Sequence, residues 1–139
     1  MLAYLRGTWQ VHRDLHDHRS GRRGVFAGEA CVVGCTYTER GELIFGAHRG
    51  PASRVHLYEQ LAEGVLEVRF ADGRPFYRLE LVDGGWRAEH PCAEDLYTVV
   101  GAVSGPDSFT ERWRAEGPTT GFTSFTTFSR IAPRSARPV

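Results

Sequence analysis

The sequence predicts an all-β protein, a single antiparallel up-and-down β-barrel of about 8–10 strands. Short runs rich in β-branched and aromatic residues recur roughly every 8–12 residues, with Gly, Pro and Asp turn signals between them. Helix signals are nearly absent, because glycine interrupts every window that approaches a helical apolar period. A sheet of this many strands tends to curl and close, which removes its edges. A sandwich of two sheets is the main alternative.

The expected strands follow one another through short connections, so neighbours in sequence should pair antiparallel. In the first strand, Trp9, Val11, Arg13 and Leu15 share one face. The pattern predicts a turn at 39–42, a loop at 46–51 and a break in the strands at 91–94. The expected strands are 7–15, 25–35, 36–38 with 43–45, 53–60, 65–70, 76–82, 86–90, 96–103, 109–116 and 121–131.

Composition bounds the partners and the compartment. The 139 residues suit one domain, expected at 1–131, followed by a flexible tail at 132–139. Lys+Arg and Asp+Glu are both 17, and this zero net charge argues against a nucleic-acid partner. All the basic residues are arginine, a bias typical of a GC-rich bacterial genome. The odd count of 3 cysteines predicts reduced thiols in a cytoplasmic protein. The absence of a long apolar run predicts that the protein has no membrane partner. A monomer or a homodimer is expected.

A family resemblance rests on the two ends of the chain. The segment Leu5-Arg6-Gly7-Thr8-Trp9 is similar to the Gly-x-Trp signature that opens the first strand of lipocalins and related calycin barrels. In that family the tryptophan closes one end of the barrel, and an arginine on the last strand often packs across its ring. Arg130 lies at the right place for that partner. The resemblance implies a lipocalin-like barrel with a cavity for a small, mostly apolar ligand.

Most of the chain also resembles an uncharacterised family of small bacterial lipocalin-like proteins, to which no reaction is assigned. The segments that carry this resemblance are Gly50-Pro51-Ala52-Ser53, Asp72-Gly73-Arg74-Pro75-Phe76, His90-Pro91-Cys92 and Asp95-Leu96-Tyr97.

The segment 90–97 holds the densest cluster of reactive side chains. Alternation puts Asp95 and Tyr97 on one face of a strand, and His90 ends the strand before it. If they face the lumen, these three could act as general acids and bases near the barrel mouth. The alternative is an ordinary loop in which Asp95 caps backbone amides. Cys92 is more simply a small thiol than a nucleophile, because catalytic Cys–His pairs normally meet through the fold.

Two carboxylates are expected on apolar faces. Glu111 shares its face with Trp113, and Glu59 shares its face with Val55 and Leu57. A carboxylate among aromatic side chains is either paired or has a raised pKa, which makes Glu111 a fourth candidate for acid–base work. A register error of one residue would reverse these faces. The ligand-lining candidates are Glu59, Arg74, Arg78, Trp113, Phe122 and Phe128.

No cofactor and no metal site is expected. His12, His16 and His18 share one face, but their polar surroundings indicate a solvated strand end. Haem binding through His48 or His90 is the less favoured alternative.

Three functions remain open. The first is a cofactor-free barrel enzyme, a cyclase, isomerase or dehydratase, acting by acid–base and conformational control on a small hydrophobic metabolite. The second is a non-catalytic carrier or sensor of a small apolar ligand. The third is an interaction protein with a solidly packed barrel. The carboxylates expected among aromatics place the enzyme slightly ahead.

Overall fold

A computed structural model describes residues 1–131, and the tail predicted at 132–139 lies outside the described residues. One short helix precedes ten strands. The elements are α1 (Leu2–Leu5), β1 (Gly7–Asp17), β2 (Arg23–Val33), β3 (Thr36–Phe45), β4 (His48–Ala62), β5 (Val65–Phe70), β6 (Pro75–Glu80), β7 (Gly85–Cys92), β8 (Asp95–Gly105), β9 (Ser108–Glu116) and β10 (Gly121–Arg130).

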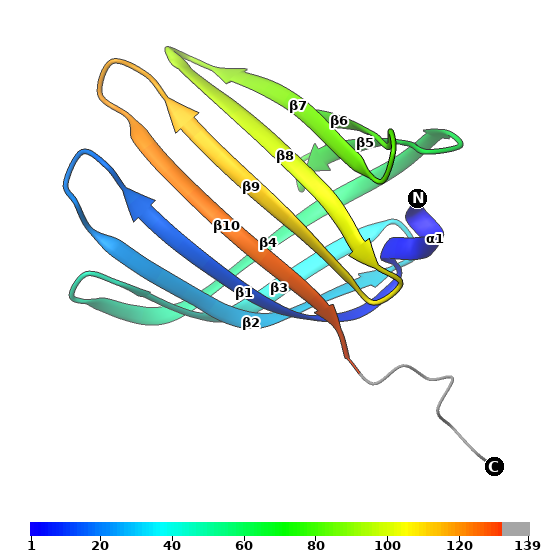
Figure 1. Cartoon of the computed structure of the whole chain (residues 1–139), viewed down its shortest axis with the longest axis horizontal. Coiled ribbons are helices and arrows are strands. Elements are labelled where there is room, and N and C mark those ends of the chain that lie inside the picture. The colour runs from blue at the N-terminus through cyan, green and yellow to red at the C-terminus, as the bar shows by residue number, and fades with distance from the viewer. Residues whose placement is uncertain (132–139) are drawn as a thin grey trace.

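All ten strands form one antiparallel sheet in the order β6-β5-β4-β3-β2-β1-β10-β9-β8-β7. The sheet curls into a nearly closed barrel, as Figure 1 shows, with β6 and β7 facing each other without a ladder between them. This confirms the predicted all-β barrel, and the single continuous sheet rules out the sandwich. None of the helices in residues 1–131 has the length and apolar character needed to cross a membrane.

One end of the barrel is closed around Trp9. Its indole is almost fully buried and donates a hydrogen bond to the carbonyl of Leu5 in α1 (2.8 Å). The Arg130 guanidinium lies 4.2 Å from the ring centroid of Trp9, and it is also held by Asp107 (2.8 Å). Arg130 further donates to the carbonyls of Tyr4 and Arg6, so it joins the last strand to α1. The predicted Trp9–Arg130 closure is confirmed, and α1 adds a lid that the sequence pattern did not indicate (Figure 1).

β3 runs unbroken where the sequence predicted a turn. Gly41 pairs with Gly28 of β2, and a Cβ on Gly28 would lie 2.7 Å from the Gly41 Cα. Because neither residue has a side chain, the two backbones approach closely while the strands bend, and no turn is needed. The turn at 39–42 was therefore a wrong prediction, which concealed that Glu39 lies within a strand. The loop at 46–51 is also shorter than predicted, since β4 begins at His48.

The break predicted at 91–94 is likewise reduced to a tight turn. β7 continues through Pro91 to Cys92, and β8 begins at Asp95. Ala93 takes a positive φ of 54°, a conformation suited to such a turn.

The apolar core fills the closed half of the barrel. Trp9 packs edge-on against Phe109 (4.9 Å between ring centroids), and Phe109 stacks on Phe128 (4.2 Å). Leu66 and Leu79 bring β5 and β6 into the same cluster. Burial alternates along β1, so Trp9, Val11 and Arg13 share one face as predicted, and in the structure that face points inward. The core therefore forms a floor, and the half of the barrel above it is hollow.

Candidate functional site

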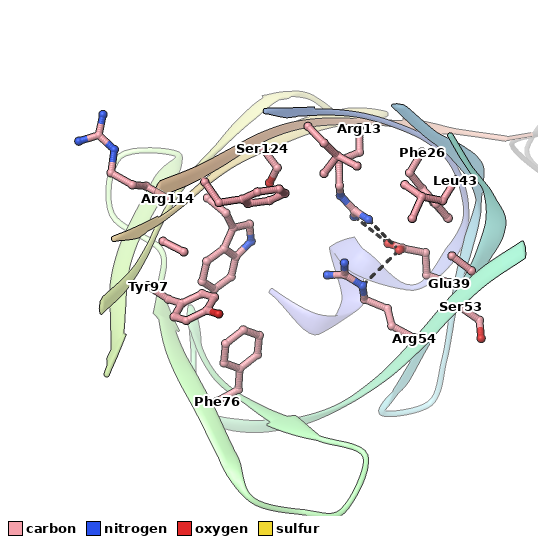
Figure 2. Close-up of a pocket in the computed structure, with 15 residues that line it drawn as sticks. Arg13, Phe26, Glu39, Leu43, Ser53, Arg54, Phe76, Tyr97, Arg114 and Ser124 are labelled. Atoms are coloured by element: carbon pink, nitrogen blue, oxygen red, sulfur yellow. Dashed lines mark hydrogen bonds and ion pairs between the residues drawn. The ribbon is translucent and has the colours of Figure 1, made fainter. Parts of the chain in front are cut away.

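A cavity of about 350 Å³ lies in the half of the barrel away from the packed core around Trp9. Its apolar wall combines aliphatic and aromatic side chains, and Figure 2 shows the ion-paired Arg13, Glu39 and Arg54 together on one side of it. The lining residues are Arg13, Leu15, Phe26, Glu39, Leu43, Ala52, Ser53, Arg54, Phe76, Tyr97, Trp113, Arg114, Ala115, Phe122 and Ser124.

A buried ion cluster lies on one side of this cavity. Arg13 donates two hydrogen bonds to the two carboxylate oxygens of Glu39, both 2.8 Å long. The Nε of Arg13 also donates to the hydroxyl of Thr126 (2.8 Å), and Tyr37 donates to Glu39. Arg54 adds an ion pair from its Nε to Glu39 at 3.3 Å. Bidentate pairing of this kind is what allows a fully buried carboxylate to stay charged.

The environment of Glu39 shifts its pKa in two opposing directions. Burial alone raises the pKa of the Glu39 carboxyl, because it penalises the charged form. The hydrogen bonds and the charge of Arg13, with help from Arg54 and Tyr37, outweigh burial and hold the pKa below its ordinary value. Glu39 is therefore a permanent anion at neutral pH, and its cluster is part of the barrel's framework.

An aromatic group faces the ion cluster across the cavity. Phe76 stacks on Trp113 with the ring planes 9° apart and the centroids 5.1 Å apart. Phe76 also stacks on Phe70 (4.4 Å) and meets His90 edge-on (5.2 Å). Since these residues come from β5, β6, β7 and β9, aromatic contacts bridge the seam where β6 and β7 lack a ladder.

A β-bulge explains why both Phe76 and Tyr77 face the interior. The register of β5 with β6 shifts between Val68 and Arg69, so that Val68 pairs with Tyr77 and Arg69 with Pro75. The extra residue, Phe76, is unpaired, and the ordinary alternation of faces is interrupted there. Phe76 therefore reaches the cavity, while Tyr77 packs below it.

A second chamber of about 40 Å³ lies next to the cavity and shares Arg13, Arg54, Phe76 and Trp113 with it. Glu111 lines this chamber and accepts hydrogen bonds from Tyr77 (3.2 Å) and from the indole of Trp86 (3.4 Å). Burial raises the pKa of Glu111, and the charge of Arg13 offsets only part of that effect. The expectation of a buried carboxylate with a raised pKa is thus met at this position.

His56 also lines the second chamber. Burial, reinforced by the positive charge of Arg54, lowers its pKa to about 4, so the ring is neutral at neutral pH. Its buried Nδ1 has no hydrogen-bond partner among residues 1–131. His56 therefore acts as an aromatic wall residue, with its ring centroid 5.5 Å from that of Phe76.

The structure brings some of the sequence-predicted site residues to the cavity. Tyr97, Trp113 and Phe122 line it. Phe128 lies deeper, in the core beneath the second chamber. Whether any of them binds a ligand remains a prediction.

Glu59, Arg74 and Arg78 point outward, contrary to the orientation expected for lumen residues. On β4 the inward face carries Arg54, His56 and Tyr58, so the face assigned from Val55 and Leu57 was off by one residue. Glu59 instead pairs with Arg69 on the outer surface (3.1 Å). A second ion pair on that surface joins Arg78 to Glu67 (3.8 Å), and a third joins Arg74 to Asp72 (2.7 Å).

Two of the acid–base candidates lie beside the cavity instead of in its lining. Asp95 accepts a hydrogen bond from Thr120 (3.0 Å), which ties the β7–β8 turn to the β9–β10 turn. His90 packs its ring among Phe70, Phe76 and Tyr97. The four catalytic candidates are therefore spread over the rim, the wall and the second chamber.

Sequence reasoning missed the ion cluster. Arg13 was placed on an apolar face with Trp9 and Val11, and a charged residue on such a face signals a buried partner. That signal could have prompted a search for an acidic side chain on another strand that also faces the barrel interior. The predicted turn at 39–42 hid Glu39, and the reversed face of β4 hid Arg54.

His12 and His16 lie on β1, and His18 follows the end of that strand. The rings of His16 and His18 lie 3.9 Å apart, and His12 pairs with Asp14 (3.3 Å) on the exposed surface. Within the part of the chain that the structure describes, no three His, Cys, Asp or Glu side chains are grouped to hold a metal ion.

Residues 5–130 match a family described as a family of unknown function, DUF6314. The chain belongs to this family. The match spans β1 to β10, so it includes every strand of the barrel. The expected membership in an uncharacterised family is confirmed. The comparison with curated proteins gives no match.

Two solved structures share the fold. One is an S-type phycobiliprotein lyase from Guillardia theta, with a TM-score of 0.67 and 11% identity over 95% of this chain and 91% of the other. The second is a protein of unknown function from the DUF3598 family of Nostoc punctiforme, with a TM-score of 0.61 and 11% identity over 94% of this chain. The match spans 49% of that longer chain. At this identity the likeness concerns the fold, and it confirms the lipocalin-like barrel.

Proposed function

We propose that this protein binds a small, largely apolar molecule inside its barrel. The observation that carries the proposal is the cavity of about 350 Å³, which lies within the size range of small-molecule sites. A barrel whose only task were structural would fill this space with side chains, because proteins pack their interiors densely. Here the packed core stops at the floor, and the wall above it is aromatic and aliphatic with a few polar groups.

The geometry favours binding over the acid–base catalysis expected from the sequence. Of His90, Asp95, Tyr97 and Glu111, only Tyr97 lines the cavity. A general acid or base must lie within hydrogen-bond reach of its substrate, and Glu111 lies in a chamber of about 40 Å³ instead. A ligand of the main cavity would meet Phe76 and Trp113 before it met Glu111.

A cavity-filling substitution tests the proposal. Ala52 lines the cavity, and a tryptophan there would occupy the ligand's space. We expect the wild-type protein to enhance the fluorescence of N-phenyl-1-naphthylamine, a neutral apolar dye, and Ala52→Trp to weaken dye binding at least about ten-fold. Ala52→Leu, a smaller filling, should give an intermediate loss.

Ala27 provides the matched control. It is exposed on the outer face of β2, so Ala27→Trp adds the same side chain without filling the cavity. Circular dichroism and urea unfolding would establish that each variant is folded. Equal dye affinities for the wild type, Ala52→Trp and Ala27→Trp would contradict binding in the barrel.

A further inference from the structure

We propose that the ligand carries a carboxylate group and that Arg54 binds this group. The inference rests on the proposed binding function and adds a chemical class to it. The cavity of about 350 Å³ is largely apolar, yet a guanidinium group extends into it from β4 (Figure 2). A cation that lines a largely apolar cavity is well placed to bind an anionic group of a ligand that enters from solvent.

The two arginines of the ion cluster are in different situations. Arg13 is fully engaged, since its Nε, Nη1 and Nη2 all donate to Thr126 or Glu39. The Arg54 side chain is 48% exposed, and its closest approach to Glu39 is through Nε at 3.3 Å. Within residues 1–131, Arg54 makes no side-chain hydrogen bond, and its ion pair with Glu39 is the one interaction that Figure 2 draws for it. Arg13 thus serves the framework, and Arg54 presents its guanidinium group to the cavity.

Glu39 cannot neutralise both arginines. Its carboxylate accepts two hydrogen bonds from Arg13 and one from Tyr37, and Arg54 adds the ion pair. Two guanidinium groups around one carboxylate leave one positive charge in the cluster. The other acid nearby, Glu111, lies in the second chamber and is bound by Tyr77 and Trp86. Glu39 instead fixes Arg54 in place, which lowers the cost of ordering it for a ligand.

The remaining charged residue of the lining does not compete for the ligand. Arg114 pairs with Glu116 (3.2 Å) and is 63% exposed, and Figure 2 shows it pointing away from the interior. The anionic group would therefore bind on the β4 side of the cavity.

The opposite wall fits a flat, unsaturated body. Figure 2 shows the Arg54 guanidinium directed across the cavity, with Phe76 and Tyr97 on the far side. Trp113 stacks on Phe76 there, and aromatic faces favour planar partners. A carboxylate is planar and can accept two parallel hydrogen bonds from one guanidinium group. Its single negative charge equals the positive charge that Glu39 leaves unbalanced in the cluster. A phosphate monoester would bring more charge than the cluster balances. A planar, apolar carboxylic acid therefore matches both the aromatic wall and the Arg54 side of the cavity.

A pair of probes that differ only in charge tests the inference. 1-Pyrenecarboxylate and its neutral analogue 1-pyrenecarboxamide would be titrated by fluorescence anisotropy at neutral pH. We expect the wild-type protein to bind the carboxylate at least about ten-fold more tightly than the amide. Arg54→Met should remove this preference by weakening carboxylate binding, with amide binding changed by less than about two-fold. Arg54→Lys keeps the positive charge but cannot donate the pair of parallel hydrogen bonds. It should therefore retain part of the preference for the carboxylate over the amide.

Arg87→Met is the matched control, because Arg87 is exposed on the outside of β7. It should bind both probes as the wild type does. Equal affinities of the wild type for the two probes, or an equal loss of both in Arg54→Met, would overturn the carboxylate inference while leaving cavity binding intact. Binding of neither probe, together with no dye binding by the wild type, would overturn the proposed function and the inference with it.

Discussion

Two glutamates that face the interior of this barrel are held in opposite ways. Glu39 is surrounded by arginines, which keep its pKa below the ordinary value despite burial. Glu111 has neutral donors as its direct partners, and burial raises its pKa. For Glu39 the charged form belongs to the folded state, whereas for Glu111 folding disfavours the charged form. The two residues should therefore respond differently to the removal of charge.

Glu111→Gln is expected to stabilise the protein at neutral pH. The unfolded chain ionises Glu111 near its ordinary pKa of 4.5, and the folded chain does so only at higher pH. As pH rises above about 4.5, ionisation of the unfolded state therefore favours unfolding. Glutamine cannot ionise and keeps an oxygen acceptor for Tyr77 and Trp86. Urea unfolding should give the variant a higher free energy of unfolding than the wild type at about pH 7. At about pH 4 the two free energies should no longer differ in this way.

Glu39→Gln provides the contrast. It leaves Arg13 buried without its anion, which typically costs about 3–5 kcal/mol. Because the folded-state pKa of Glu39 is depressed, its contribution to stability is present above the ordinary pKa and is lost as pH falls through the folded value.

A Glu111→Gln variant less stable than the wild type at neutral pH would mean that the charged carboxylate is favoured in the second chamber.

At the scale of the strands, the close approach of β2 and β3 depends on two glycines. A Cβ added to Gly28 would lie 2.3 Å from the carbonyl oxygen of Arg40, and backbone cannot move aside as a flexible side chain can. Gly28→Ala should therefore lower the free energy of unfolding by about 1–3 kcal/mol, as overpacking does elsewhere. Urea unfolding would measure this.

Gly121→Ala is the comparison for this substitution. Its nearest neighbour would be the side chain of Arg19 at 3.6 Å, an ordinary contact. We expect a change within about 0.5 kcal/mol for this variant. Equal effects of the two substitutions would show that the β2–β3 approach relaxes without cost.

The sequence predicted strands well and their inward faces less well. β1 was predicted correctly because Trp9, Val11 and Leu15 alternate with polar residues. β4 was wrong because it carries apolar residues outside, at Val55, and polar ones inside, at Arg54. A polar residue that faces inward needs a partner on another strand, and periodicity within one strand cannot supply that information. The bulge at Phe76 was hidden for the same reason, since it exists only in the pairing with β5.

Considered as a whole molecule, the barrel has one seam. β6 and β7 each pair with a single neighbour, and aromatic contacts such as Phe76 with His90 bridge them. Elsewhere, as at β1, each strand has ladders on both sides. The closure of the barrel at this seam therefore depends on side chains.

Hydrogen exchange should reveal the seam. Alternate amides of β6 and β7 face the gap without a strand to accept from them, so they are expected to exchange faster than the amides of β1 and β10. Mass spectrometry of peptides that cover these four strands would measure the difference. Protection of β6 and β7 as strong as that of β1 would argue for a closed ladder in solution.

The floor of the barrel was predictable, whereas its contents were not. Trp9 and Arg130 lie at opposite ends of the chain, and the resemblance to calycin barrels implied a stacked closure, which the structure confirms. The cavity exists because side chains from many strands leave space between them in the assembled barrel. Arg13, Glu39 and Arg54 come from three strands, and only the assembled barrel brings them together.

The pairing of β1 with β10 has a consequence for how the protein forms. Every other ladder joins strands consecutive in the chain, but this one joins residues as far apart as Trp9 and Arg130. Such distant closure is costly in chain entropy and slow. During synthesis, the ribosome must release the chain through β10 before Arg13 meets Thr126 and Arg130 covers Trp9. A nascent chain that lacks β10 can form the earlier hairpins, but the cavity is complete only when β10 joins the sheet.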